Sequence, residues 1–250
     1  MSPVTVITYW WRPDPGSKFA CPYAPDDVRL LQRMVARHLT VPHRFAVITD
    51  QPKAFDSYWC EDHIIEYDGI IPIKLDRSTH VPGTCFARLM TFHPKGREMI
   101  GERVLQLDLD TVIVGNMDHL VTREEDLVLW RNPALHPSRP GRSLYNTSIL
   151  LHKCGTMPEL WQAFLNLGKG RIPAKDDQWY LSDALGPDVP YFDGKRDGVY
   201  RIARLDTPGS GVWGDLPANA CVVTCPGSEG KADNPQVAAA NPWLASFMNV

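Results

Sequence analysis

The chain has 250 residues, of which 44% are hydrophobic and 22% charged, as in an ordinary globular protein. Its 26 basic and 29 acidic residues give a formal net charge of −3, which excludes a protein covered all over by basic charge. The composition also excludes collagen-like, coiled-coil and wholly disordered classes. No run of 18 apolar residues occurs, and the N-terminus lacks the basic region of a signal peptide. We therefore expect a cytoplasmic protein without a membrane span, with its six cysteines reduced and mostly buried.

The first part of the chain alternates strand and helix patterns. Val4–Tyr9 is rich in β-branched residues and predicts a first strand, and Asp26 and Asp27 open a stretch with apolar residues at helical spacing. Arg44–Thr49 predicts a second strand and His63–Tyr67 a third. A strand, a helix and a strand in succession indicate a βαβ unit with a mostly parallel sheet.

The remaining elements complete an α/β chain. Phe86–His93 predicts a short helix that Pro94 ends, and Arg103–Val114 is the most strand-like run of the sequence. We find no internal repeat, low-complexity tract or linker, so the sequence predicts a single domain over residues 1–250. Further strands are predicted at Leu127–Arg131, Ser148–His152, Tyr200–Ala203 and Cys221–Thr224, and further helices at Met157–Leu167 and Asp176–Leu185.

Two aspartates stand in the middle of the most strand-like run. Alternation along a strand places Gln106, Asp108 and Asp110 on one side, at the carboxyl end where open α/β sheets bind ligands. Two adjacent carboxylates beside a core repel each other and resist desolvation, and a divalent cation relieves both costs. Oxygen ligands suit Mg²⁺ or Mn²⁺. The alternative is a solvated turn in which both acids contact only water or an arginine; a glycosidase pair, which flanks its sugar from two sides, is disfavoured.

These residues resemble a known family. The segment VLQLDLDTVIVGNMDHL is similar to the strand–DxD–strand segment of GT-A fold glycosyltransferases, above all glycosyltransferase family 8, the glycogenin and lipopolysaccharide-galactosyltransferase type, with its bacterial and phage relatives. Three further segments match in chain order: CFARLMTFHP, YNTSILLHK and DDQWYLSDAL. The resemblance extends from about Val4 to Lys231 and implies a GT-A (Rossmann-like) fold with helices flanking a mostly parallel sheet.

The resemblance implies metal-dependent transfer of a sugar from a nucleotide sugar, usually a UDP-sugar, to an unknown acceptor with retention of configuration. Asp108 and Asp110 match the acids that hold Mn²⁺ or Mg²⁺ against the diphosphate. Arg88 matches a helix position near the phosphates, where a guanidinium suits phosphate recognition; the alternative is a surface arginine. Thr8 and Tyr9 fall where the family places the nucleotide base, although ordinary core packing also explains a tyrosine there.

Two later segments match the sugar side of the family's site. Asn146 and Ser148 match an Asn-x-small motif beside the donor or acceptor sugar, and amide and hydroxyl groups suit sugar hydroxyls. A turn before a strand is the alternative. Asp177 and Gln178 match an Asp-Gln pair that lines the reaction centre, where the glutamine would stabilise positive charge or orient the sugar. Asp176 is an alternative register for the acid, and capping of the helix explains either aspartate.

The sequence departs from the family near its C-terminus. The family places a metal-binding histidine there, whereas residues 224–226 of this chain are Thr, Cys and Pro. A thiol is a soft ligand and a poor one for Mg²⁺ or Mn²⁺, so the third ligand is a water, a carboxylate such as Asp233, or absent. Lys231 remains a candidate for phosphate contact, and Asp50, which closes the second strand, is a candidate neighbour of the nucleotide.

The stretch between Asp126 and Glu159 contains no acid and carries a formal charge of +4. A solvated loop explains it, but an anionic acceptor, such as a phosphorylated glycan or a nucleic acid, does so too. A phage-type enzyme that glycosylates a modified DNA base is thus one alternative function. A second is a nucleotide-sugar-binding protein without turnover, suggested by the missing histidine. A nucleotidyltransferase is disfavoured because no glycine-rich phosphate loop is present. The four basic residues are Arg131, Arg139, Arg142 and Lys153.

Overall fold

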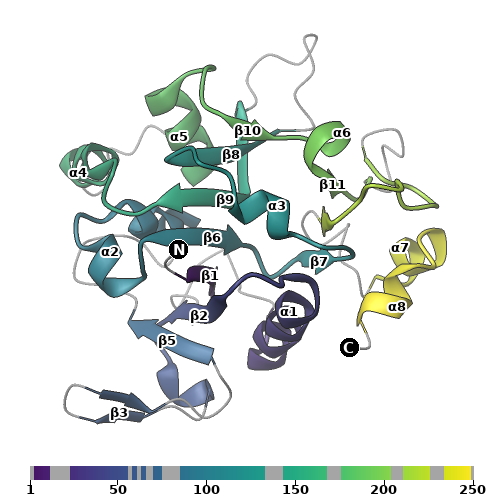
Figure 1. Ribbon diagram of the computed structural model, residues 1–250, viewed down its shortest axis with the longest axis horizontal. Helices are drawn as coiled ribbons and strands as arrows, with labels where there is room; N and C mark the ends of the chain where they lie inside the picture. The colour runs from purple at the N-terminus through teal and green to yellow at the C-terminus, as the bar shows by residue number, and fades with distance from the viewer. Residues whose placement is uncertain are drawn as a thin grey trace.

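The computed structural model describes residues 3–11, 23–55, 58–60, 63–65, 70–74, 85–132, 143–167, 176–203, 211–225 and 234–248. They form an α/β structure around a seven-stranded sheet, whose strands follow one another from β10 at the top of Figure 1 to β5 at the bottom. The spatial order is β10 (Tyr191–Phe192), β8 (Leu127–Arg131), β9 (Tyr145–Lys153), β6 (Arg103–Leu107), β1 (Val4–Tyr9), β2 (His43–Thr49) and β5 (Ile70–Lys74).

The sheet is mostly parallel, as the sequence predicts. Only β9 runs antiparallel, and it does so to both of its neighbours, β8 and β6. All other neighbouring pairs are parallel. The carboxyl ends of β1, β2, β6 and β8 and the first residues of β9 therefore meet at one edge, which we call the carboxyl edge of the sheet. Every residue of β1 is buried, as expected of a central strand covered on both faces.

Two apolar clusters cover the two faces of the sheet. One contains Val6, Leu105 and Trp130 and is closed by α1 (Pro25–His38), whose Val28, Leu31, Met34 and Val35 are buried at helical spacing. The other contains Ile7, Val104 and Leu129 and is closed by the 3₁₀ helix η2 (Cys85–Phe92) and by α4 (Pro158–Leu167) and α5 (Asp177–Leu185). We call this second side the η2 face; the site described below lies on it.

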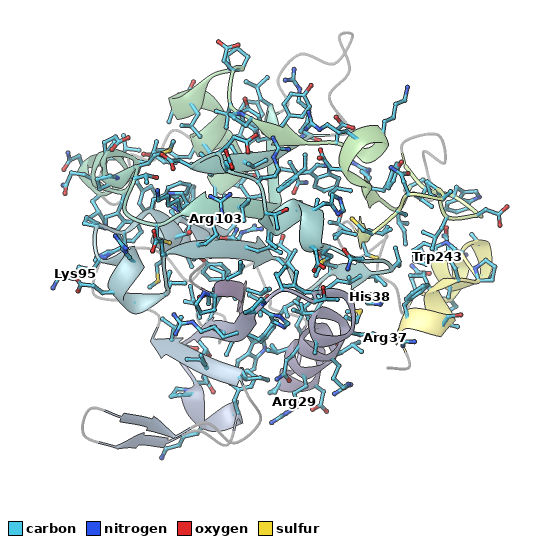
Figure 2. The ribbon with its side chains drawn as sticks, in the orientation of Figure 1. Arg29, Arg37, His38, Lys95, Arg103 and Trp243 are labelled. Carbon is cyan, nitrogen blue, oxygen red and sulfur yellow. The ribbon has the colours of Figure 1, made fainter. Side chains whose placement is uncertain are left out.

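Smaller elements surround the main sheet. A three-stranded sheet of β11 (Val199–Arg201), β12 (Val222–Thr224) and β7 (Thr111–Ile113) lies beside it, at the right of Figure 1. Near it, the ring of Phe247 lies 6.3 Å from that of His38, at the end of α1, and 6.4 Å from that of Trp243. Figure 2 labels His38 and Trp243. The remaining elements are η1 (Pro52–Phe55), β3 (Tyr58–Cys60), β4 (His63–Ile65), α2 (Gly96–Met99), α3 (Asp118–Val121), α6 (Gly194–Asp197), α7 (Pro235–Ala240) and α8 (Leu244–Met248).

The structure corrects the third strand predicted from the sequence. His63–Ile65 pairs with Tyr58–Cys60 in a separate two-stranded sheet, and residues 66 and 67 lie outside the described part of the chain. The strand that continues the main sheet after β2 is β5, which contains Pro72. A proline lacks a backbone N–H and is tolerated in a strand at a sheet edge, which is where β5 lies.

The structure also divides the run Arg103–Val114. β6 ends at Leu107, Leu109 and Asp110 form a turn, and β7 joins the three-stranded sheet through antiparallel pairing with β12. Asp110 therefore does not share a strand face with Asp108, and the alternation argument was wrong for it. A turn at this point leaves the residues Asp108 and Asp110 partly exposed, although one carboxylate oxygen of Asp110, Oδ1, is buried.

Two whole-chain expectations can be compared with the described residues. The described residues include no helix long and apolar enough to cross a membrane. Four cysteines of the described part are free thiols, and Cys154, Cys221 and Cys225 among them are buried, as we expected.

Candidate functional site at the carboxyl edge

Three charged side chains from three elements meet at the carboxyl edge of the sheet. Arg88 comes from η2, Asp108 follows β6, and Asp177 is the first residue of α5. The Arg88 Nη1 atom donates to both oxygens of Asp108, at 2.8 and 2.6 Å, and its Nε lies 3.0 Å from Oδ2 of Asp177. One guanidinium thus bridges two carboxylates. Burial alone would lower the pKa of Arg88, but the two carboxylates raise it well above its usual value.

Asp177 is the most deeply buried member of this cluster, with no exposed side-chain surface. Its Oδ2 also accepts a 2.7 Å hydrogen bond from the Thr147 hydroxyl, and its backbone N–H donates to the Cys85 thiol. Burial raises the pKa of Asp177 to about 6, against the opposing effects of Arg88 and Thr147. Its other oxygen, Oδ1, is buried and accepts no hydrogen bond within the described residues. A buried carboxylate oxygen without a hydrogen-bond partner is unusual and often marks a functional position.

The first strand contributes its end to the same edge. The Tyr9 hydroxyl donates a 3.0 Å hydrogen bond to the Arg88 carbonyl oxygen, and burial raises the pKa of Tyr9 well above its usual value. Thr8 is fully buried, and its hydroxyl finds no partner in the part of the chain described here. Asp50 directly follows β2, two strands away from β6 at this edge.

The predicted Asn-x-Ser and Asp-Gln segments also lie at this edge. The Asn146 side-chain oxygen accepts a 2.7 Å hydrogen bond from the Ser148 backbone N–H, and the Ser148 carbonyl accepts the N–H of Asp108. Gln178 lies 3.5 Å from the Ser143 hydroxyl. Asp176 accepts the Trp179 backbone N–H at 2.9 Å and caps α5. Helix capping therefore accounts for Asp176, whereas Asp177 belongs to the charged cluster.

Asp110 lies at the junction between the two sheets. Its backbone carbonyl accepts the N–H of Cys225 at 2.7 Å, which joins the aspartate turn to the end of β12. No group of three or more His, Cys, Asp or Glu side chains in the described residues is arranged to hold a metal ion. Asp108 and Asp110 thus offer two carboxylates, of which Arg88 already neutralises one. This donor set fits Mg²⁺ or Mn²⁺ where a bound diphosphate supplies further oxygen ligands. Lys231 and Asp233 lie outside the described residues.

The sequence analysis assigned no role in the site to two residues that the structure places there, Thr147 and Gln106. Thr147 holds Asp177, and Gln106, which is 1% exposed, donates from Nε2 to the Thr147 carbonyl at 3.1 Å. The signal for Gln106 was a polar residue inside the apolar run VLQL. Thr147 gave no separate signal, because threonine is common in strands. Through these hydrogen bonds the two residues connect the charged cluster to the interior of the sheet.

Comparisons with known proteins identify the type of fold. No protein-family model and no curated protein matches the chain. Its structure is similar to that of the galactosyltransferase LgtC in complex with donor and acceptor sugar analogues, with a TM-score of 0.61 and 14% identity over 98% of this chain and 95% of LgtC. The chain has the GT-A glycosyltransferase fold. An active-site mutant of LgtC matches with a TM-score of 0.59 and 13% identity.

A second neighbour supports the same fold. The apo form of the glycosyltransferase GlyE of Streptococcus pneumoniae matches with a TM-score of 0.59 and 13% identity over 94% of this chain. The chain spans 57% of the length of GlyE. At these identities the likeness establishes the fold, in agreement with the fold that the sequence motifs led us to expect. A fold does not by itself determine the chemistry of its site.

Proposed function

We propose that the protein is a glycosyltransferase that moves a sugar from a nucleotide sugar, in the first place a UDP-sugar, to an acceptor hydroxyl. The observation that carries this proposal is the bridge from Arg88 to Asp108 and Asp177 at the carboxyl edge of a GT-A sheet. That edge is where open α/β sheets bind their ligands. A guanidinium there suits the diphosphate of the donor, and a carboxylate suits a divalent ion bound to that diphosphate.

In the proposed reaction the bond between the anomeric carbon and the diphosphate oxygen breaks, and a bond to the acceptor oxygen forms. With retention of configuration, the departing phosphate oxygen takes the acceptor proton, so no strong protein base is needed. Arg88 faces the negative charge that develops on the diphosphate. Asp177 offers its free Oδ1 to a hydroxyl of the transferred sugar. Gln178 orients that sugar or stabilises positive charge on it.

A divalent ion completes this proposal. Asp108 and Asp110 would hold Mn²⁺ or Mg²⁺ together with the diphosphate, and the ion would act as a Lewis acid that stabilises the leaving group. Because Arg88 occupies the Asp108 carboxylate, we expect the ion to bind weakly until a nucleotide is present.

A panel of nucleotide sugars with Mn²⁺ or Mg²⁺ tests the function, with release of free nucleotide as the readout. We expect slow release from one donor of the panel. Asp108→Asn should reduce this release on the order of 100-fold, the loss typical of one group that stabilises transition-state charge. Asp126→Asn is the matched control, because Asp126 is 52% exposed, lies 4.0 Å from Lys153 and precedes β8, at the end of that strand opposite to the carboxyl edge.

The same experiment also distinguishes the proposed enzyme from a binding protein without turnover. Binding of a nucleotide sugar without release in any condition would favour a binding protein that kept the fold and lost turnover, as the missing histidine suggests. Normal release of nucleotide by Asp108→Asn would contradict the proposal, since this variant removes the carboxylate that pairs with Arg88 and would bind the metal ion.

A further inference from the structure

Two guanidinium groups lie over the ring of Tyr191, the first residue of β10. The Arg131 Cζ atom is 5.0 Å from the ring centroid and the Arg196 Cζ atom 5.4 Å. A guanidinium over an aromatic face is held by the ring quadrupole and keeps a defined orientation. The ring of Tyr191 therefore helps to orient both guanidinium groups.

The two arginines differ in what neutralises them. Arg196 lies 2.8 Å from Asp197 and 3.9 Å from Asp193. Arg131 is partly buried, and the described residues place no carboxylate within ion-pair distance of it. Residues 127–158 contain no acid, so no close neighbour in the sequence supplies a counter-charge. Within the described part of the chain, Arg131 thus carries a positive charge that no ion pair neutralises.

Arg131 lies on the same edge and the same face as the charged cluster. It ends β8, which is separated from β6 by the antiparallel strand β9, so its strand is about 10 Å from the strand of Asp108. Leu127 and Leu129 pack on the η2 face, and alternation places Arg131 on that face too. Asp177 and its guanidinium partner belong to the same face. Arg131 therefore shares the edge and face of the predicted sugar site, with its guanidinium over the neighbouring strand β10, on the side of β8 away from β6.

We propose that Arg131, stacked on Tyr191, binds a phosphate or carboxylate group on a glycan acceptor. This inference rests on the proposed function, because only a transferase has an acceptor. An arginine fork matches the oxygens of such a group bidentately, and the ligand would supply a counter-charge that the described residues do not. The contact would select anionic over neutral acceptors and would weaken as salt is added.

Calorimetry with saturating UDP and Mg²⁺ tests the inference, because the nucleotide then fills the donor side. The probes are glucose, galactose and mannose, their 6-phosphates, glucuronate and inorganic phosphate. At least one anionic sugar should bind about tenfold more tightly than its neutral counterpart and more tightly than inorganic phosphate, the gain of one charge-assisted contact. Absence of UDP binding in the same experiment would count against the proposed function itself.

Variants locate the contact. Arg131→Gln should remove the preference for the anionic sugar while leaving UDP binding unchanged, and Arg131→Lys should retain part of it, because the charge remains and the fork is lost. Arg97→Gln is the matched control, since Arg97 is 65% exposed and pairs with Glu102 at 2.9 Å. Equal binding of neutral and anionic sugars, or an unchanged preference in Arg131→Gln, would overturn the inference. So would Arg131-dependent binding of a single-stranded oligonucleotide without binding of any anionic sugar.

Discussion

Replacement of Thr147 by valine tests whether the buried part of the site is held together as described. The change keeps the shape of the side chain and removes the hydroxyl that donates to Asp177 over 2.7 Å. Thr147 is 1% exposed and Asp177 0%, so water cannot replace the lost donor. A hydrogen bond to a buried charged group contributes about 1.5–3 kcal/mol. We therefore expect Thr147→Val to lower the free energy of unfolding by about 2 kcal/mol, or the melting temperature by about 4–8 °C for a chain of this size.

Urea unfolding at pH 7.5 and pH 5 measures this effect. The loss should be larger at pH 7.5, because burial raises the pKa of Asp177 to about 6 and the charged form accepts the stronger bond. Thr147→Ser keeps the hydroxyl and should retain most of the stability. Thr156→Val is the surface control: its hydroxyl donates to the Lys153 carbonyl at 2.8 Å in an exposed turn, so we expect less than about 0.5 kcal/mol. Equal stabilities of Thr147→Val and Thr147→Ser would refute the reasoning.

Three further predictions concern other parts of the molecule. Burial lowers the pKa of His152 to about 4, so the folded state favours the neutral ring, and stability present above pH 6.5 is lost as the pH falls toward 4. Between pH 7 and 5 this loss is about 2 kcal/mol, and urea unfolding should show it to be absent in His152→Asn. Gln178→Ala should lower kcat more than it raises the Kd for the nucleotide in steady-state and binding assays; equal effects would indicate a binding role only. Gly198→Ala should destabilise by at least about 2 kcal/mol in urea unfolding, because φ is +70° and the new Cβ would lie 2.1 Å from the Asn219 carbonyl; wild-type stability would contradict that backbone geometry.

Local sequence patterns were enough to predict the strands and helices in which apolar residues recur with a single period. The strand at Val4–Tyr9 and the helix that Asp26 and Asp27 open were confirmed, because side-chain alternation and helical spacing are properties of consecutive residues. The turn that interrupts residues 103–114 was missed, since both of its flanks are strongly apolar. The hidden strand β5 was missed because Pro72 is unfavourable in a central strand and acceptable only at an edge, which the sequence does not reveal.

The site was predicted as a set of residues, and its connections were not. The family resemblance indicated Arg88, Asp108 and Asp177 as site residues. It did not show that one guanidinium bridges the two carboxylates, because that contact depends on how η2 and α5 pack against the sheet. Nor did it reveal Thr147, whose hydroxyl matters only through the carboxylate it faces. The roles of the individual residues, including those at the metal position, remain predictions for the experiments above.

The turn between β6 and β7 carries a consequence of its own. Asp108 is fastened through its N–H to β9 of the large sheet, whereas the Asp110 carbonyl is fastened to the residue after β12 of the small one. A ligand bound by both side chains would therefore connect the large sheet to the small one. We expect ligand binding to slow amide hydrogen exchange in β11 and β12.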